Sequence, residues 1–337
     1  MPKHQWDAII TGARHNGAVT AIHNVKTLNN AVFLFIPLLA LWLGCQTTTL
    51  NIADIGTSAN PLVKSGELIT DEVWAGKVLI SGDVLISEGV TLTIQSGAVV
   101  GFEPADTPYQ LIVRGTLYAE GEPDNFITFG SLGTADEEPK PGDWAGIYID
   151  SASQNARLGY CRIRDAINGI ICQSDAIQIE DCLLSNNEVA IICDNASPIA
   201  NRNQLDTNGT AIRCLGNSAP DLAHNEIRAN EYGISCDDDS RPKIQRNEII
   251  ANYRDAILCY STASPEIIAN NIIMNRGWAV YEGGRLRDNF LRGNNEAGVD
   301  VIERGTGRDG VQYYGVEEVF DPRSTPVPDA GIPREGY

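Results

Sequence analysis

The chain has 337 residues, 43% of them hydrophobic, and its 25 basic and 44 acidic side chains give a formal net charge of −19. Such an acidic chain repels phosphate backbones and anionic lipid headgroups, which are bound by clusters of Lys and Arg. We therefore expect neither nucleic-acid binding nor electrostatic docking on a membrane, and the apolar content is sufficient for a large core.

Residues 31–44, AVFLFIPLLALWLG, form an apolar run near the beginning of the chain. A run of this length is short for a membrane span but typical of the hydrophobic part of a signal peptide. A leader that begins at Val25 would have a conventional length, so we expect translation to start downstream of Met1. The sequence therefore predicts export, with residues 1–44 as the leader.

The apolar run ends in the letters LWLGC at positions 41–45, which resemble the lipobox of bacterial lipoproteins, although Trp42 stands where Leu is usual. The resemblance implies that Cys45 is acylated and becomes the mature N-terminus, and Gln46 after it favours the outer membrane. A cleaved secretory leader and an N-terminal anchor helix are the alternatives. Residues 45–73 have mixed polarity and many Gly, Pro, Ser and Thr residues, which indicates a tether.

The folded part is expected to begin at residue 74 with strands of alternating polarity. In VTLTI, residues 90–94, apolar side chains alternate with threonine, as in a strand that is buried on one side. Segments of the same kind follow at residues 111–131 and 143–149. These segments predict the opening coils of a β-rich repeat structure.

Residues 143–294 repeat every 21–23 positions. Each repeat contains Gly/Ala-Ile-x-Cys and three short β-prone pieces separated by turn residues, with too few apolar residues at helical spacing for helices. Four positions recur: Cys172, Cys193, Cys214, Cys236 and Cys259; Pro198, Pro220, Pro242 and Pro265; Asn203, Asn225, Asn247, Asn270 and Asn289; and Asn186, Asn208, Asn230, Asn252, Asn275 and Asn294. The pattern predicts an all-β parallel solenoid of about ten three-sided coils over residues 74–303.

The phrases GVTLTI and SGAVVGF and the later repeats resemble the right-handed parallel β-helix superfamily of pectate lyases, polygalacturonases and NosD-type periplasmic proteins. The resemblance implies a right-handed β-helix. A NosD-type relationship implies a copper role. Copper ligands are lacking, because after Cys45 the sequence has one histidine, His224, and one methionine, Met274. We expect no cofactor and no metal, apart from a weak Ca²⁺ site considered below.

Eight cysteines in an exported chain ordinarily indicate disulfides. The five regularly spaced cysteines instead occupy one point of successive coils, where parallel side chains about 4.8 Å apart are too far separated for usual disulfide geometry. We expect buried thiols that act as small apolar fillers, with disulfides and a metal row as alternatives. Cys161 and Cys182 form a shorter row, and the alternation around them does not determine which way they face.

The densest acidic run is Asp237, Asp238 and Asp239. Polysaccharide lyases and hydrolases of the β-helix superfamily carry carboxylates and a base on one outward face, and the lyases also bind calcium. The resemblance therefore makes the three aspartates the catalytic residues to examine. A Gly-His-Gly hydrolase signature is absent from the sequence, and His224 aligns with a corner. We expect a solvated acidic turn, with a weak Ca²⁺ site and a catalytic site as alternatives.

The position between Ile and Cys of each repeat should point outward, yet it is unusually apolar. It is occupied by Tyr148, Ile171, Ile192, Arg213, Ser235, Leu258 and Tyr281. An exposed apolar row usually marks a contact surface, so we expect the C-terminal tail or a partner to cover it. Residues 304–337 form this tail, and we also expect them to cap the last coil.

Together these features favour an envelope-anchored, non-catalytic β-helix that presents one face to a polysaccharide or to an envelope protein. Membrane contact is expected only through the lipid anchor. The alternative is a carbohydrate-active enzyme, either a polysaccharide lyase or a glycoside hydrolase. The fold does not decide between them, because function lies in sites that a fold carries.

Overall fold

The computed structural model describes residues 60–134, 136–260, 262–295, 301–302 and 323–332. Within these ranges every regular element is a β-strand, and no helix long and apolar enough to cross a membrane is found. All of the strands belong to the unit Leu62–Tyr337. The predicted leader and the predicted lipidation residue Cys45 lie outside the described residues.

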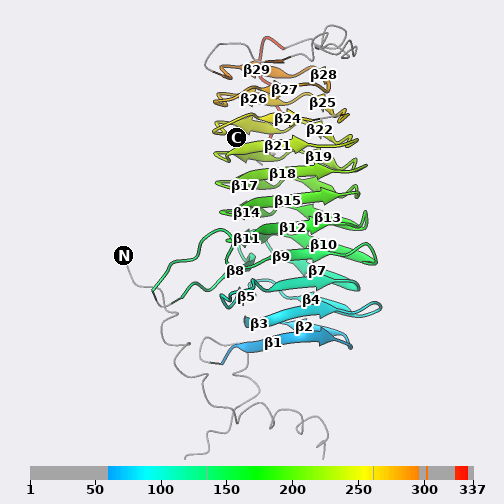
Figure 1. The fold of residues 1–337 in the computed structure, drawn as a ribbon, viewed down its shortest axis with the longest axis vertical. Helices are drawn as coiled ribbons and strands as arrows, with labels where there is room; N and C mark the ends of the chain where they lie inside the picture. Colours follow the sequence, from blue (N-terminus) through cyan, green and yellow to red (C-terminus); the bar gives the residue numbers. More distant parts are fainter. Residues whose placement is uncertain (1–59, 135, 261, 296–300, 303–322, 333–337) are drawn as a thin grey trace, which may run out of the picture. The chain divides into compact units, whose positions relative to one another are not determined.

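The strands stack as the rungs of a three-sided parallel solenoid (Figure 1). Face 1 contains β2 (Glu72–Trp74), β4 (Thr91–Ile94), β7 (Thr116–Glu120), β10 (Asn155–Gly159), β13 (Ile177–Glu180), β16 (Ile199–Asn201), β19 (Asp221–Ala223), β22 (Lys243–Gln245), β25 (Glu266–Ile268) and β28 (Arg285–Arg287). Face 2 contains β5 (Val99–Phe102), β8 (Ile127–Ser131), β11 (Cys161–Arg164), β14 (Leu183–Ser185), β17 (Gln204–Asp206), β20 (Glu226–Arg228), β23 (Glu248–Ile250), β26 (Asn271–Ile273) and β29 (Phe290–Arg292). Face 3 contains β6 (Gln110–Val113), β9 (Gly146–Ile149), β12 (Asn168–Cys172), β15 (Val189–Asp194), β18 (Thr210–Leu215), β21 (Tyr232–Cys236), β24 (Ile257–Cys259), β27 (Val280–Tyr281) and β30 (Val301–Ile302).

Two longer strands, β1 (Leu62–Leu68) and β3 (Lys77–Ile86), run along both face 2 and face 3 in the first coils, since β3 pairs with β5 and with β6. The ten strands of face 1 confirm the expected solenoid of about ten coils. Its first coil begins at β1, inside the segment 45–73 that the sequence indicated as a tether. The sequence did not reveal β1 because it is an edge strand in which Leu68 is the one buried residue.

The regularly spaced cysteines line the interior of face 3. Cys172, Cys193, Cys214, Cys236 and Cys259 pair in register on successive strands, and all five are free and fully buried. Burial raises the pKa of Cys172, so this thiol stays protonated. The expected role of the row as a small apolar filler is confirmed.

Asparagine side chains join the coils at the corner between face 1 and face 2. The Oδ1 of Asn225 accepts hydrogen bonds from the backbone N–H and the Nδ2–H of Asn203 at 2.9 and 3.1 Å, while the Nδ2 of Asn225 donates to the carbonyl of Ala200 at 2.9 Å. The same arrangement continues through Asn247, Asn270 and Asn289. These bonds satisfy backbone groups that the turn leaves unpaired.

Cys161 and Cys182 are the first two rungs of this ladder. The backbone N–H of Cys182 donates to the Oδ1 of Asn203 at 3.0 Å, and that of Cys161 donates to the Sγ of Cys182 at 3.4 Å. Both side chains are fully buried. Their facing, which the sequence left open, is therefore inward.

A second ladder lies at the corner between face 2 and face 3, and its first asparagine is Asn187, not Asn186 as the spacing indicated. The Oδ1 of Asn187 accepts from the N–H of Ala166 at 3.0 Å, and its Nδ2 donates to the Oδ1 of Asn208 at 3.0 Å. Asn186 instead makes the turn, with a left-handed φ of 57°. Asparagine tolerates this conformation better than most residues, so Asn186 fits the turn while Asn187 fits the ladder.

The first coil carries charged side chains at inward positions. Lys64 and Glu72 pair in register with the buried Ile80 and Leu92, and they form an ion pair at 2.5 Å. The indole N–H of Trp74 donates to the same Glu72 carboxylate at 2.7 Å. Inward-pointing charges of this kind prevent a further strand from stacking on an open sheet edge.

The described part of the C-terminal tail, residues 323–332, runs along the corner between face 1 and face 2, and we call it the strap. Its hydrogen bonds join Arg323 N to Asn289 O (2.8 Å), Val327 N to Asn271 Oδ1 (2.7 Å) and Gly331 N to Arg246 O (2.8 Å). With the contact between His224 and Asp329, the strap thus reaches four successive coils from the side. The side chain of Asn271 and the corner carbonyls supply its partners, and the expectation that residues 304–337 cap the last coil stays a prediction because most of them lie outside the described residues.

Candidate functional site

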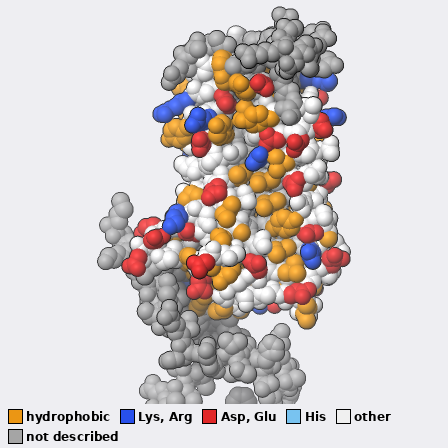
Figure 2. Space-filling model, viewed as in Figure 1, with side chains coloured by type: hydrophobic (Ala, Val, Ile, Leu, Met, Phe, Trp, Pro, Cys, Tyr) orange, Lys and Arg blue, Asp and Glu red, His pale blue; other side chains and the backbone are white. Residues whose placement is uncertain are grey.

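The outward row predicted from the repeats exists as a continuous line along face 3. Tyr148, Ile171, Ile192, Arg213, Ser235, Leu258 and Tyr281 pair in register on β9, β12, β15, β18, β21, β24 and β27. Hydrophobic side chains form a band across successive coils in Figure 2, with carboxylates beside it. Strand alternation places this band on the solvent side because the cysteine row occupies the inward positions.

The N-terminal half of the row is aliphatic apart from Tyr148. The Tyr148 hydroxyl donates to the Oε1 of Gln173, whose Nε2 donates in turn to the Oδ2 of Asp194 at 2.6 Å. Burial, followed by the charges of Asp150 and Asp194, raises the pKa of Tyr148. The hydroxyl is therefore a proton donor held in a surface network and is not an activated base.

Polar side chains interrupt the row in its middle. The Nε of Arg213 lies 3.0 Å from the Oδ2 of Asp237, and the hydroxyl of Ser235 donates to the same oxygen at 3.4 Å. Asp237 is thus committed to neighbours on its own face, and only 14% of its side chain is exposed.

The C-terminal half of the face carries a group of aromatic side chains, which we call the tyrosine patch: Tyr232, Leu258, Tyr260 and Tyr281. They come from three successive coils, with Tyr232 in β21, Leu258 in β24, Tyr260 directly after β24 and Tyr281 in β27. Leu258 is only 6% exposed although it points away from the core, whereas Tyr260 is 47% exposed. The patch therefore has a covered aliphatic centre and accessible aromatic edges.

Sequence reasoning identified two members of the patch and missed the other two. Tyr232 and Tyr260 flank the Ile-x-Cys phrase on either side, at positions that point outward in their coils but lie outside the single column that we followed. Comparing the positions just before and just after this phrase in successive repeats would have identified both tyrosines. The electrostatics support the grouping, since burial and then the neighbouring Tyr232, Asp237 and Asp255 raise the pKa of Tyr260.

The acidic run after Cys236 does not form one site. Arg213 pairs with Asp237, the N–H of Gly216 donates to the Oδ2 of Asp238 at 3.0 Å, and the hydroxyl of Thr262 donates to Asp239. Within the described ranges, no set of three His, Cys, Asp or Glu side chains that could hold a metal ion is found. The three carboxylates therefore have three different partners.

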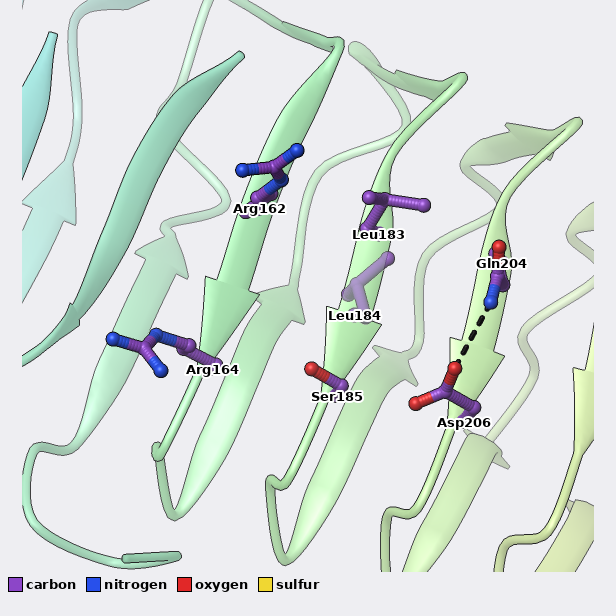
Figure 3. Close-up of a pocket in the computed structure, with 7 residues that line it drawn as sticks. All are labelled: Arg162, Arg164, Leu183, Leu184, Ser185, Gln204 and Asp206. Carbon is purple, nitrogen blue, oxygen red and sulfur yellow. Dashed lines mark hydrogen bonds between the residues drawn. The ribbon is translucent and has the colours of Figure 1, made fainter. Parts of the chain in front are cut away.

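A shallow depression lies on face 2 and is shown in Figure 3. It is lined by Arg162, Arg164, Leu183, Leu184, Ser185, Gln204 and Asp206. The short side chains of β14 lie between the arginines of β11 and the polar pair of β17, in which Gln204 donates to Asp206 at 2.9 Å. The guanidinium of Arg162 lies 4.8 Å above the ring of Phe126. Asp206 is the one carboxylate of the lining, and it is occupied by Gln204 and by Arg228 at 3.5 Å.

The strap leaves the tyrosine patch uncovered, since its contacts are with the corner before face 2. The imidazole Nδ1 of His224 lies 3.1 Å from the carbonyl of Asp329, and Arg246 lies 3.5 Å from the Asp329 carboxylate. Among the described residues, no hydrogen bond or ion pair joins residues 323–332 to face 3. His224 is therefore a corner residue that helps to hold the strap, as its alignment indicated.

A family model described as the right-handed beta helix region matches residues 145–312. The chain belongs to the right-handed β-helix superfamily. Among solved structures, a mutant of the periplasmic alginate epimerase AlgG is similar, with a TM-score of 0.51 and 13% identity over 72% of this chain and 70% of that chain. A double mutant of the same epimerase gives a TM-score of 0.38 and 14% identity over 70% and 67% of the two chains. No curated protein sequence matches.

At these identities the likeness to solved β-helices establishes the fold alone. The expected right-handed parallel β-helix is confirmed by the family match and by the parallel pairing of its coils. What this member does must be argued from its own exposed side chains.

Proposed function

We propose that this β-helix is a non-catalytic scaffold of the cell envelope that binds glycans through the tyrosine patch of face 3. The observation that supports the proposal is the patch itself, in which tyrosines from three successive coils share face 3 with Leu258, and the carboxylates of Asp237 and Asp255 act on Tyr260. Aromatic side chains offer large rigid contact areas with a polar tip, and carboxylates accept hydrogen bonds from hydroxyl groups. Both are suited to the apolar faces and the hydroxyls of sugars.

The absence of catalysis is part of the proposal. A glycosidase needs two carboxyl groups facing one bond, and a lyase needs a base beside a cation that stabilises the developing charge. In the described structure Asp237 is paired with Arg213, and His224 lies at a distant corner beneath the strap. The scaffold requires no cofactor.

The envelope location is also a proposal. It rests on the LWLGC segment ending at Cys45, which lies outside the described residues, and it agrees with the periplasmic origin of the structurally similar epimerase. In the bacterium, Cys45→Ala should release the protein from the membrane fraction. If labelled palmitate does not enter the wild-type protein, the anchor is excluded while the glycan site is untouched.

Binding is tested with a panel of immobilised oligosaccharides and the purified chain from residue 46 onward. Tyr260→Ala should weaken binding by up to about tenfold, the loss of one aromatic contact. Tyr253→Ala is the matched control, because Tyr253 is 54% exposed but lies at the corner before face 3. Equal losses in the two variants would show that the patch is not the site.

The same panel tests for catalysis. Unsaturated products would reveal a lyase, and new reducing ends would reveal a hydrolase. Either signal, abolished by Asp238→Asn in a folded protein, would replace the scaffold with an enzyme.

A further inference from the structure

The tyrosine patch lies in a part of face 3 where negative charge is not balanced. Two arginines of this part of the molecule are paired, Arg213 at 3.0 Å from Asp237 and Arg254 at 3.4 Å from Glu231, and the guanidinium of Arg276 lies over the Tyr253 ring at 4.9 Å. Asp255 has no cationic partner among the described ion pairs, and its Oδ1 accepts a hydrogen bond from the backbone N–H of Trp278 at 2.6 Å. A ligand on the patch therefore meets carboxylates whose charge is only partly compensated.

The pKa values of the tyrosines reflect this negative charge. Burial raises the pKa of Tyr281, and Glu282 and Asp255 raise it further; burial and neighbouring acidic groups act on Tyr260 in the same direction. Both phenols therefore remain protonated, and their rings offer electron-rich faces, while the Tyr281 hydroxyl is already hydrogen-bonded to Glu282. Ring faces of this kind attract cations, and more strongly where water is partly excluded.

The patch is also elongated along the solenoid axis. Its residues belong to β21, β24 and the strand β27, and neighbouring strands of a sheet are about 4.8 Å apart, so the patch extends roughly 10 Å along the axis. This length suits two or three consecutive sugars of a linear chain lying across the coils. Positions in register repeat at a constant spacing, so each sugar meets an equivalent outward position.

From these observations we infer that the patch selects linear glycans that carry amino groups, and that it discriminates against glycans that carry carboxylates. The inference rests on the proposed function, since it names the ligand class of the same site. An ammonium group gains from both the carboxylates and the ring faces, whereas a uronate is repelled by Asp237 and Asp255. An N-acetylated sugar keeps the contacts with the tyrosine rings but lacks the positive charge. Its affinity should therefore lie between those of the amino sugar and the uronate.

The inference is tested by calorimetry with three oligosaccharides of equal length, built from glucosamine, N-acetylglucosamine and galacturonate, at a pH where the amine is protonated. The glucosamine chain should bind most tightly, the acetylated chain more weakly and the galacturonate chain least. Salt screens charges that are exposed to solvent, so only the glucosamine affinity should fall with rising ionic strength. Affinity should increase from the monosaccharide to about the trimer and then level off, in keeping with a patch roughly 10 Å long.

A matched pair of variants isolates the charge. Asp255→Asn keeps an oxygen that accepts from Trp278 and should weaken glucosamine binding roughly fivefold, with no change for the acetylated chain. Glu266→Gln removes one exposed carboxylate of the same coil on face 1 and should change neither. Equal binding of amine and acetylated chains, or tighter binding of the uronate, would overturn the charge selection and leave glycan binding intact. Failure of all three chains to bind would contradict the proposed function itself.

Discussion

The coils before Cys161 and the coils after it build the same solenoid from different interactions. The early interior is filled by large aromatic side chains, Trp74, Phe102, Phe129 and Trp144, all fully buried. In the later coils the described core contains only aliphatic residues and cysteine, and the corners carry the asparagine ladders. The early region thus depends on a few side chains that fit one place, and the later region on one hydrogen-bonded arrangement repeated in every coil.

The largest effect is expected from Trp144→Ala in the early region. The Trp144 ring stacks on Phe102 with centroids 4.0 Å apart, and its indole N–H donates to the carbonyl of Arg164 at 2.7 Å. Removing it leaves a large cavity and an unpaired carbonyl, at a cost of about 4 kcal/mol in the free energy of unfolding measured in urea. Trp278→Ala, at a partly exposed position in the late region, should cost less than about 1 kcal/mol. Similar costs would remove the distinction between the two cores.

Asn225→Leu breaks the ladder of the later region and should cost about 3 kcal/mol, because it orphans the backbone N–H of Asn203 inside the protein. Hydrogen exchange should rise in the coils next to the break, since coils contact only their neighbours. Asn217→Leu is the control, because Asn217 is exposed and lies outside the ladder. If exchange rises throughout the early coils as well, the two regions unfold as one cooperative unit.

A smaller and opposite effect is expected where the regions meet. Asp165 is buried; its Oδ1 accepts from Asn186 at 2.6 Å, and its Oδ2 has no hydrogen-bond partner and lies 3.6 Å from the Nε of Arg164. Burial raises its pKa above the ordinary 3.8, so the stability that this carboxyl contributes is present below 3.8 and is lost as the pH rises through the folded-state pKa. Asp165→Asn should therefore raise Tm at neutral pH, and the gain should vanish as the pH falls toward 3.8. A gain that does not depend on pH would exclude this cause.

The smallest effect is expected from Cys182→Asn, which extends the amide ladder one coil toward the early region. The new amide would accept from the N–H of Cys161 and donate to Asn203, in place of the weak contact at the Cys182 Sγ. We expect a gain of up to about 1 kcal/mol in chemical denaturation. A loss would mean that the early coils leave no room for the larger side chain, which would sharpen the contrast between the regions.

Regularity determined how much of this fold could be predicted from the sequence. Stacked coils place equal positions in contact, so residue types that recur with the coil period reveal their role, as the buried cysteines of face 3 did. Asn186 and Asn187 are identical neighbours, and only the backbone conformation distinguishes the turn residue from the rung. The position of the strap could not be predicted from the sequence, because its partners, such as Asn271, also fit the ordinary repeat pattern.

The candidate site shows the same limit. The outward row followed from strand alternation, but a surface site also involves neighbouring columns and the charges around them. Tyr260 directly follows Cys259, so the sequence pattern places it in the turn. That Arg213 neutralises Asp237, while Asp255 binds only a backbone N–H, depends on side-chain conformations that no spacing encodes.

The polarity of the asparagine ladder bears on how such a protein changes over generations. Each rung accepts from the coil before it and donates to the carbonyl of that coil, and the rungs at Asn203 and Asn225 are 22 residues apart. A gene segment that encodes one such period can be duplicated or deleted. The coils that become neighbours in the protein then still join through the same asparagine hydrogen bonds. Face 3 then gains or loses one outward position, so the length of its outward row can evolve by whole coils while every corner keeps the same hydrogen bonds.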